Sequence, residues 1–82
     1  MNRHCLFHYR TRVGTFWIAQ QPGGRGRFLL GIGDEALGSY HSPAAAADDV
    51  YCQATGCYEW DALGPVTSPT DLSEWRKGPP DR

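Results

Sequence analysis

The chain has 82 residues, of which 40% are hydrophobic and 12% aromatic, and a formal net charge of −1. This length supports one domain near the lower limit for an independent hydrophobic core. The sequence contains no apolar run long enough to cross a membrane. Its N-terminus, MNRHCLFHYRTR, lacks the apolar segment and cleavage site of a secretory signal. We therefore expect a cytoplasmic protein with no membrane partner.

The near-neutral net charge hides a strong segregation of charge along the chain. Residues 1–33 have a formal charge of +5 and contain no acidic residue. Residues 34–82 contain all nine acidic residues and have a formal charge of −6. Such segregation indicates one surface suited to acidic partners and another suited to basic ones. The basic residues of the first part are Arg3, Arg10, Arg12, Arg25 and Arg27.

Four β-strands are predicted in the first half of the chain, at residues 5–11, 15–21, 27–32 and 36–40. Aromatic and β-branched residues are frequent in these segments, as is typical of strands. The second and third are separated by PGGRG at 22–26, which must be a loop because proline and three glycines cannot sustain a ladder. No helical segment intervenes, so the strands are expected to pair antiparallel.

A helix is predicted at about residues 43–55. Ser42 suits the N-cap because its hydroxyl accepts from an orphan backbone N–H, and Pro43 suits the first helical position. Gly56 is expected to end the helix in the left-handed conformation. The residues predicted to form its buried face are Ala46, Val50 and Ala54, with Ala47 and Tyr51 alongside.

The residues after the helix include large side chains that a thin core can use. Trp60 and Trp75 either complete that core or form a partner-binding edge. Residues 77–82 (KGPPDR) are predicted to form a disordered tail. We therefore expect a single α+β domain at residues 1–76: an antiparallel sheet of three or four strands, one helix packed on one face and a C-terminal segment at the edge.

Strands followed by one alanine-rich helix form a recognisable order. The residues that mark it are Leu37-Gly38-Ser39-Tyr40, Ser42-Pro43, Ala45, Ala46, Ala47, Val50 and Tyr51. This pattern resembles the Apetala-type, or ethylene-response-factor, DNA-binding fold, and the resemblance covers roughly residues 13–56. The chain also resembles small bacterial proteins of unknown activity that carry similar Leu-Gly-Ser-Tyr, Ser-Pro, Ala-Ala-Asp-Asp-Val and Thr-Gly segments ahead of a Trp-Asp pair.

The resemblance implies an uncovered sheet face that contacts DNA. The family lays its sheet in the major groove, with arginine and tryptophan side chains on the outer face. Strand alternation places Trp17 on the opposite face from Phe16 and Ile18, where it either stacks on bases or is part of the core. FLLGI, at 28–32, is typical of a buried strand and departs from the family pattern. The candidate nucleic-acid-binding residues are Arg10, Arg12, Trp17, Arg25 and Arg27.

Cysteine and histidine spacing raises the alternative of a zinc site. Cys5 and His8 have Cys-x2-His spacing, and Cys52 and Cys57 have Cys-x4-Cys spacing. Four such ligands can close a tetrahedral zinc site. However, Cys5 and His8 should point to opposite faces of an extended strand, and Cys52 should face the sheet. His4 and His41 are further candidate ligands. The alternative interpretation is one buried thiol and two incidental ones.

No residue pattern indicates catalysis. No nucleophile turn surrounds a cysteine, and Asp48 and Asp49 are adjacent on a helix, so they cannot share one site. We expect a non-enzymatic binding module without a cofactor. Nucleic acid bound by the arginine-bearing sheet face is the expected ligand. The alternatives are a protein-interaction or self-associating module, with the basic sheet of one copy against the acidic helix of another, and a small zinc-stabilised module.

Overall fold

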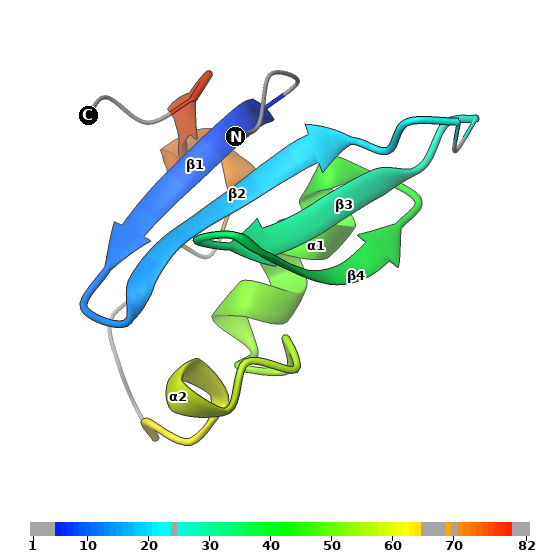
Figure 1. Ribbon diagram of the computed structural model, residues 1–82. Helices are drawn as coiled ribbons and strands as arrows, with labels where there is room; N and C mark the ends of the chain where they lie inside the picture. The colour runs from blue at the N-terminus through cyan, green and yellow to red at the C-terminus, as the bar shows by residue number, and fades with distance from the viewer. Residues whose placement is uncertain (1–4, 24, 65–68, 70, 80–82) are drawn as a thin grey trace.

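The computed structural model describes residues 5–23, 25–64, 69 and 71–79, and it confirms the α+β class (Figure 1). Within these residues, no helix is long and apolar enough to span a bilayer. The elements in chain order are β1 (Cys5–Thr11), β2 (Gly14–Gln20), β3 (Phe28–Ile32), β4 (Glu35–Tyr40), α1 (Pro43–Tyr51), α2 (Tyr58–Asp61), a 3-10 helix η1 (Leu72–Glu74) and β5 (Arg76–Lys77).

The strands form one antiparallel sheet in the order β4-β3-β2-β1-β5. The first four strands follow one another as hairpins, as the short turns between them predict. The expected C-terminal segment at the sheet edge is strand β5, which pairs with β1 and makes the sheet five-stranded instead of three- or four-stranded. Lys77 pairs with Phe7 in this strand, so the sheet extends past residue 76, where we placed the end of the domain.

Helix α1 covers one face of the sheet, called here the inner face (Figure 1). Phe16, Ile18 and Leu30 point to this face and are fully buried. The helix buries Ala46, Ala47 and Val50 against them. Alanine side chains let the helix approach the strands closely, and the fully buried Ile18, Leu30 and Val50 each contribute about 1.5–3 kcal/mol to folding.

Helix α1 begins where the sequence predicts and ends four residues earlier. Ser42 is the N-cap and its Oγ accepts from the Ala45 N–H at 3.1 Å. The last helical residue is Tyr51, and the left-handed residue after it is Gln53, with φ 56°, instead of Gly56. Ala54 and Tyr51 are consequently exposed. The prediction of a helix to residue 55 with Ala54 in its buried stripe is therefore wrong.

The residues after α1 complete the core. Trp60 of α2 packs edge-on against Phe16, with ring centroids 5.3 Å apart. The ring centroids of Trp75 and Tyr9 are 5.6 Å apart. Both indoles are buried, so the core interpretation of the two tryptophans is confirmed. The neighbouring Tyr58 is 79% exposed and contributes little to it.

Candidate nucleic-acid interface

The outer face of the sheet, opposite α1, carries Trp17, as strand alternation predicts, but the ring is buried. Trp17 is only 6% exposed and belongs to a second apolar cluster with Cys5, Ala19 and Leu29. Its ring lies over Gly31, where a Cβ would overlap the ring atoms, and its Nε1 donates to the Gly33 carbonyl at 2.8 Å. Of the two roles considered for Trp17, base stacking and a place in the core, its burial supports the core.

A β-bulge at Leu6 brings Cys5 and His8 to the same outer face. Cys5 pairs with Ala19 and His8 with Trp17, so one extra residue separates them. Both side chains contact the Gly78 carbonyl, His8 through Nδ1 at 2.8 Å and Cys5 through Sγ at 3.6 Å. The expectation that the two point to opposite faces is wrong, because it assumed a regular strand.

These contacts are structural and do not assemble a metal site. Cys5 and Cys57 are both buried, but Cys57 lies in the inner core, on the other side of the sheet from Cys5. Cys52 follows the end of α1 and is exposed instead of facing the sheet. No three potential ligands cluster among the described residues, and His4 lies outside them. Burial raises the pKa of the Cys5 thiol, which disfavours a metal-binding thiolate.

The five candidate nucleic-acid-binding residues do not form one continuous surface. Arg10 lies on the outer face opposite Thr15, and Arg12 lies in the turn between β1 and β2. Arg25 and Arg27 lie in the loop between β2 and β3, at the other end of the sheet (Figure 1). Since β2 has seven residues, about 20 Å separate these two ends. Of the five, only Arg25 and Arg27 line a common cavity.

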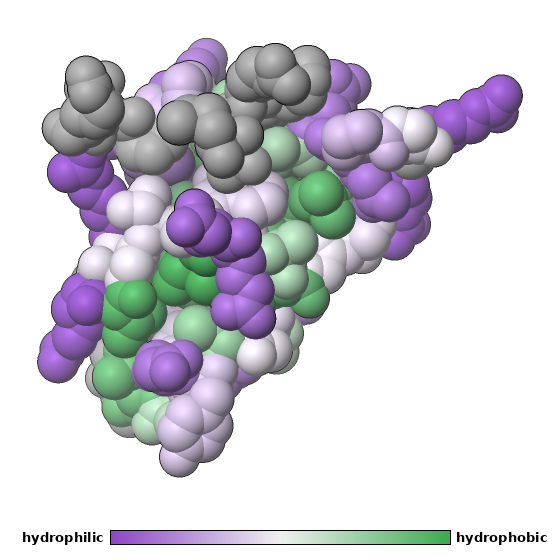
Figure 2. Space-filling model, viewed as in Figure 1, coloured by the Kyte–Doolittle hydropathy of each residue, from purple (hydrophilic) through white to green (hydrophobic). Residues whose placement is uncertain are grey.

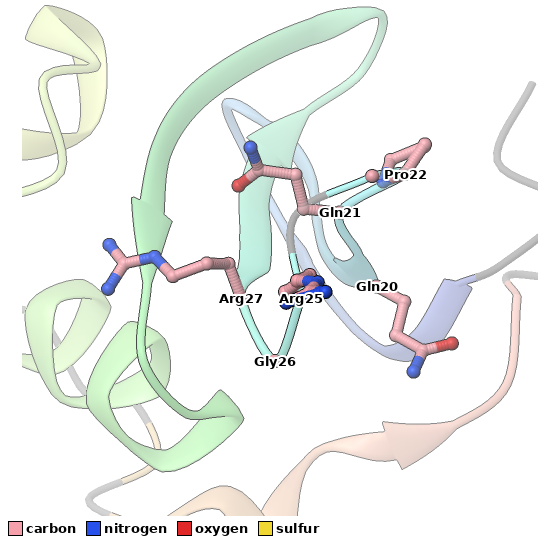
Figure 3. A pocket seen from close by; sticks show the side chains of 7 residues that line it. Gln20, Gln21, Pro22, Arg25, Gly26 and Arg27 are labelled. Carbon is pink, nitrogen blue, oxygen red and sulfur yellow. The ribbon is translucent and has the colours of Figure 1, made fainter.

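Residues 21–23 and 25–27, called here the arginine loop, line a cavity of about 310 Å³ (Figure 3). The Gln21 N–H donates to the Arg27 carbonyl at 3.0 Å and closes the loop. Figure 2 shows the hydrophilic end of this loop projecting from the body of the molecule at upper right. Every described residue lining the cavity is neutral or basic; they are Gln20, Gln21, Pro22, Gly23, Arg25, Gly26 and Arg27.

Arg27 is held in place by strand β4. Its Nε donates to the Ser39 Oγ at 3.1 Å and its Nη2 donates to the Ser39 carbonyl at 2.9 Å. The Ser39 hydroxyl in turn donates to the Gln21 side-chain oxygen at 2.6 Å. These bonds link the start of β3, the end of β4 and the loop, so the guanidinium has a fixed position beside β4 (Figure 3).

Sequence reasoning found both arginines of the cavity but missed Ser39, which orients one of them. The sequence indicated Ser39 only as a residue near the end of a predicted strand. Its role depends on the pairing of Leu29 with Ser39, which places the serine beside the start of β3. A serine and a glutamine that lie 18 residues apart in the sequence carry no local signal for such a network.

Comparisons with models of known protein families, with curated proteins and with solved structures find no match to this chain.

Proposed function

We propose that this protein is a non-enzymatic nucleic-acid-binding module that contacts the phosphate backbone through the arginine loop. The observation that carries the proposal is that Arg25 and Arg27 line one cavity with no acidic residue among its described lining. The absence of acidic residues from positions 1–33 supports it, since no neighbour in the chain neutralises these arginines. The resemblance to the Apetala-type family also favours nucleic acid as the ligand class.

The chemistry of the cavity suits a phosphate group. A guanidinium presents five N–H donors in a rigid fork that matches phosphate oxygens. The bonds to Ser39 use Nε and Nη2 of Arg27, so other donors of the group are available to a ligand. The amides of Gln20 and Gln21 add neutral donors beside the two charges. Since Arg27 is already ordered, binding loses less side-chain entropy there.

The arginine loop supports phosphate contacts better than it supports reading of base edges. The centre of the outer face is filled by Trp17 over Gly31, with Ala19 and Leu29 beside it. These side chains offer few donors or acceptors to a base edge. We therefore propose binding with little sequence preference, led by the loop, in place of a sheet that reads the major groove.

Salt dependence of DNA affinity tests the proposal. We expect fluorescence anisotropy with a labelled mixed-sequence duplex to show binding at low salt. The plot of log affinity against log salt should have a slope of about −2 if two phosphates are neutralised. Arg25→Gln and Arg27→Gln should each reduce the magnitude of that slope by about 1.

Arg12→Gln is the matched control, because it removes the same charge at the opposite end of the sheet. It should leave the slope nearly unchanged. No binding of the wild-type protein at low salt would overturn the proposal. Equal losses for Arg12→Gln and Arg25→Gln would show that overall charge acts and the cavity does not.

A further inference from the structure

Two buried side chains that take no part in the proposed function approach one backbone oxygen. Cys5 is 6% exposed and His8 is 5% exposed. The His8 Nδ1 lies 2.8 Å from the Gly78 carbonyl oxygen, and the Cys5 Sγ lies 3.6 Å from the same atom. A thiol beside an imidazole is the pairing from which nucleophilic cysteines are built. Here a single carbonyl group near the end of the chain covers both members of the pair.

The segment that carries this carbonyl is held mainly by hydrogen bonds. Residues 76–79, called here the C-terminal latch, lie beside β1 (Figure 1). They bury no apolar side chain, since Arg76, Lys77 and Pro79 are exposed. The latch forms two residue pairs with β1, and the Gly78 N–H donates to a β1 carbonyl at 2.7 Å. Each such bond adds little net stability, because water replaces it when the segment opens. Opening of the latch therefore costs much less than unfolding of the core.

The three cysteines differ in what must move before each can react. Cys52 is exposed, so its reaction requires no movement. Cys57 is part of the inner core with Phe16 and Trp60, so its exposure requires that the core open. Cys5 lies on the outer face, where the latch covers it. The protein thus contains an exposed thiol, a thiol in the core and a thiol beneath a short terminal segment.

We propose that the C-terminal latch is redox-sensitive: when it leaves β1, Cys5 exchanges with a small disulfide, and the mixed disulfide that forms keeps the latch from closing. In this exchange the Cys5 sulfur attacks one sulfur of the small disulfide. A new S–S bond forms at Cys5 and the original S–S bond breaks. The thiol proton passes through His8 to the thiolate that leaves, so the small disulfide is the oxidant and no other co-reactant is required.

His8 changes its hydrogen-bonding role when the latch opens. In the closed latch its Nδ1 donates to the Gly78 carbonyl. After the carbonyl has left, the neutral imidazole can present Nδ1 as an acceptor for the proton of the neighbouring thiol. Burial raises the pKa of the Cys5 thiol in the closed latch, so the sulfur is protonated and unreactive there. Opening removes the cover and frees the proton acceptor in one step.

A group attached to Cys5 and the closed latch compete for the same space. The Cys5 Sγ lies 3.2 Å from the Phe7 carbonyl oxygen and 3.6 Å from that of Gly78. Because the residue is almost fully buried, an added sulfur-linked group must displace a neighbour. The latch is the neighbour that leaves most easily. Modification and opening therefore favour each other, and by linkage each shifts the other by the same factor.

Exchange with oxidised glutathione, followed at each cysteine by mass spectrometry of the full chain, tests the latch. We expect Cys52 to react first, Cys5 next and Cys57 last, with Cys5 about tenfold faster than Cys57 or more. Gly78→Pro removes the N–H that binds β1 and does not fit the φ of 81° at this position. It should accelerate exchange at Cys5 about tenfold and leave Cys57 protected. Lys77→Ala is the matched control, because it changes an exposed side chain of the latch and keeps the backbone bonds.

The Gly78→Pro background isolates the role of His8. The latch is already open there, so adding His8→Gln removes the proton acceptor without changing the cover. Exchange at Cys5 should then slow about tenfold relative to Gly78→Pro alone, while exchange at Cys52 should not change. An unchanged rate at Cys5 would overturn the role of His8 as proton acceptor.

Hydrogen exchange at the Gly78 amide shows whether modification holds the latch open. Cys52→Ser leaves Cys5 as the one thiol outside the core, so the mixed disulfide with glutathione forms there. After modification the Gly78 amide should exchange about tenfold faster, and reduction with dithiothreitol should restore its protection. In the Cys5→Ser, Cys52→Ser double variant, the same treatment should leave that amide unchanged.

Two results would overturn the proposal. One is an equal rate of exchange at Cys5 and Cys57, which would show that Cys5 is reached only when the core unfolds. The other is a Gly78 amide that stays protected after Cys5 has been modified. Neither result depends on DNA affinity, so the failure of the latch and the failure of nucleic-acid binding are distinguishable.

Discussion

The burial of Trp17 depends on Gly31, its partner on the neighbouring strand. Alternation in the sequence places Trp17 on the face opposite Phe16 and Ile18, which the structure confirms. Its burial depends on Gly31, the residue paired with it on β3, which leaves room for the ring. That pairing is a matter of strand register, and no local pattern around either residue specifies it.

Replacing Gly31 with alanine should destabilise the protein by about 2 kcal/mol or more, because the new methyl group overlaps the Trp17 ring in a packed cluster. Gly38→Ala is the matched control within a strand. Its Cβ would lie 3.4 Å from the nearest Tyr40 ring atom, an ordinary contact, and its effect should stay within about 1 kcal/mol. Urea unfolding curves measure both. Equal losses would mean that the ring moves away from Gly31 without cost.

Helix α1 separates what local chemistry predicts from what tertiary contacts decide. Its beginning follows from Ser42 and Pro43, whose preferences operate within one turn. Its end depends on α2, since the Trp60 Nε1 donates to the Val50 carbonyl at 2.9 Å and the Gln53 side chain donates to the Trp60 carbonyl at 2.9 Å. The first bond satisfies a carbonyl at the end of α1, and the second ties Gln53, just past that end, to α2. Gly56 misled the prediction because Gln53 has a positive φ earlier in the chain, next to the end of the helix.

The bond between β4 and α1 should make stability depend on alkaline pH. Tyr40 donates to Asp49 at 2.7 Å, and burial, this bond and the charges of Asp49 and Asp61 raise the pKa of Tyr40 to about 12. An unfolded tyrosine titrates near pH 10. The folded state favours the neutral phenol, so this stabilisation is complete below about pH 10 and is lost as pH rises towards 12.

Tyr40→Phe should lower the free energy of unfolding at neutral pH by about 1 kcal/mol and flatten its decline above about pH 10. Tyr58→Phe is the control, because Tyr58 is 79% exposed and makes no contact that fixes α1. Urea unfolding at a series of pH values gives both quantities. An unchanged alkaline profile in Tyr40→Phe would assign the pH dependence to other groups, of which the partly buried Tyr9 is the first candidate.

At the scale of the whole molecule, the sequence predicted the antiparallel sheet and the side of the helix that packs on it. Strand β5 was not predicted, because two exposed basic residues carry no strand pattern. It forms because Gly78 is fixed at three points, by its N–H to the Leu6 carbonyl at 2.7 Å and by the side chains of Cys5 and His8. The bulge that brings Cys5 and His8 together is equally invisible in the sequence.

Thiol reactivity should report on this attachment of the C-terminal segment. In the intact protein only Cys52 should react rapidly with a thiol reagent, because Cys5 and Cys57 are buried. A chain ending at Trp75 loses β5 and the Gly78 carbonyl, so Cys5 should become reactive while Cys57 stays protected. Reactivity of Cys57 would show that the truncated chain has unfolded. Continued protection of Cys5 in a folded truncated chain would contradict the role of Gly78.

The candidate site was predicted in part. The charge pattern identified Arg25 and Arg27, and composition identified the loop that carries them. That these two arginines line one cavity, and that Arg10 and Arg12 lie away from it, follows from where each residue falls along the hairpins. A list of basic residues in a sequence contains no such distances.

The charges are distributed unevenly along the chain despite its net charge of −1. Positions 34–75, which include both α-helices and η1, contain eight acidic residues and no lysine or arginine, whereas the arginine loop contains two arginines and no acidic residue. Near a polyanion, a molecule with this charge distribution experiences little net attraction but a torque that turns the arginine loop towards the polyanion. Orientation before contact would then raise the fraction of collisions that are productive, and added salt would slow association by screening that torque.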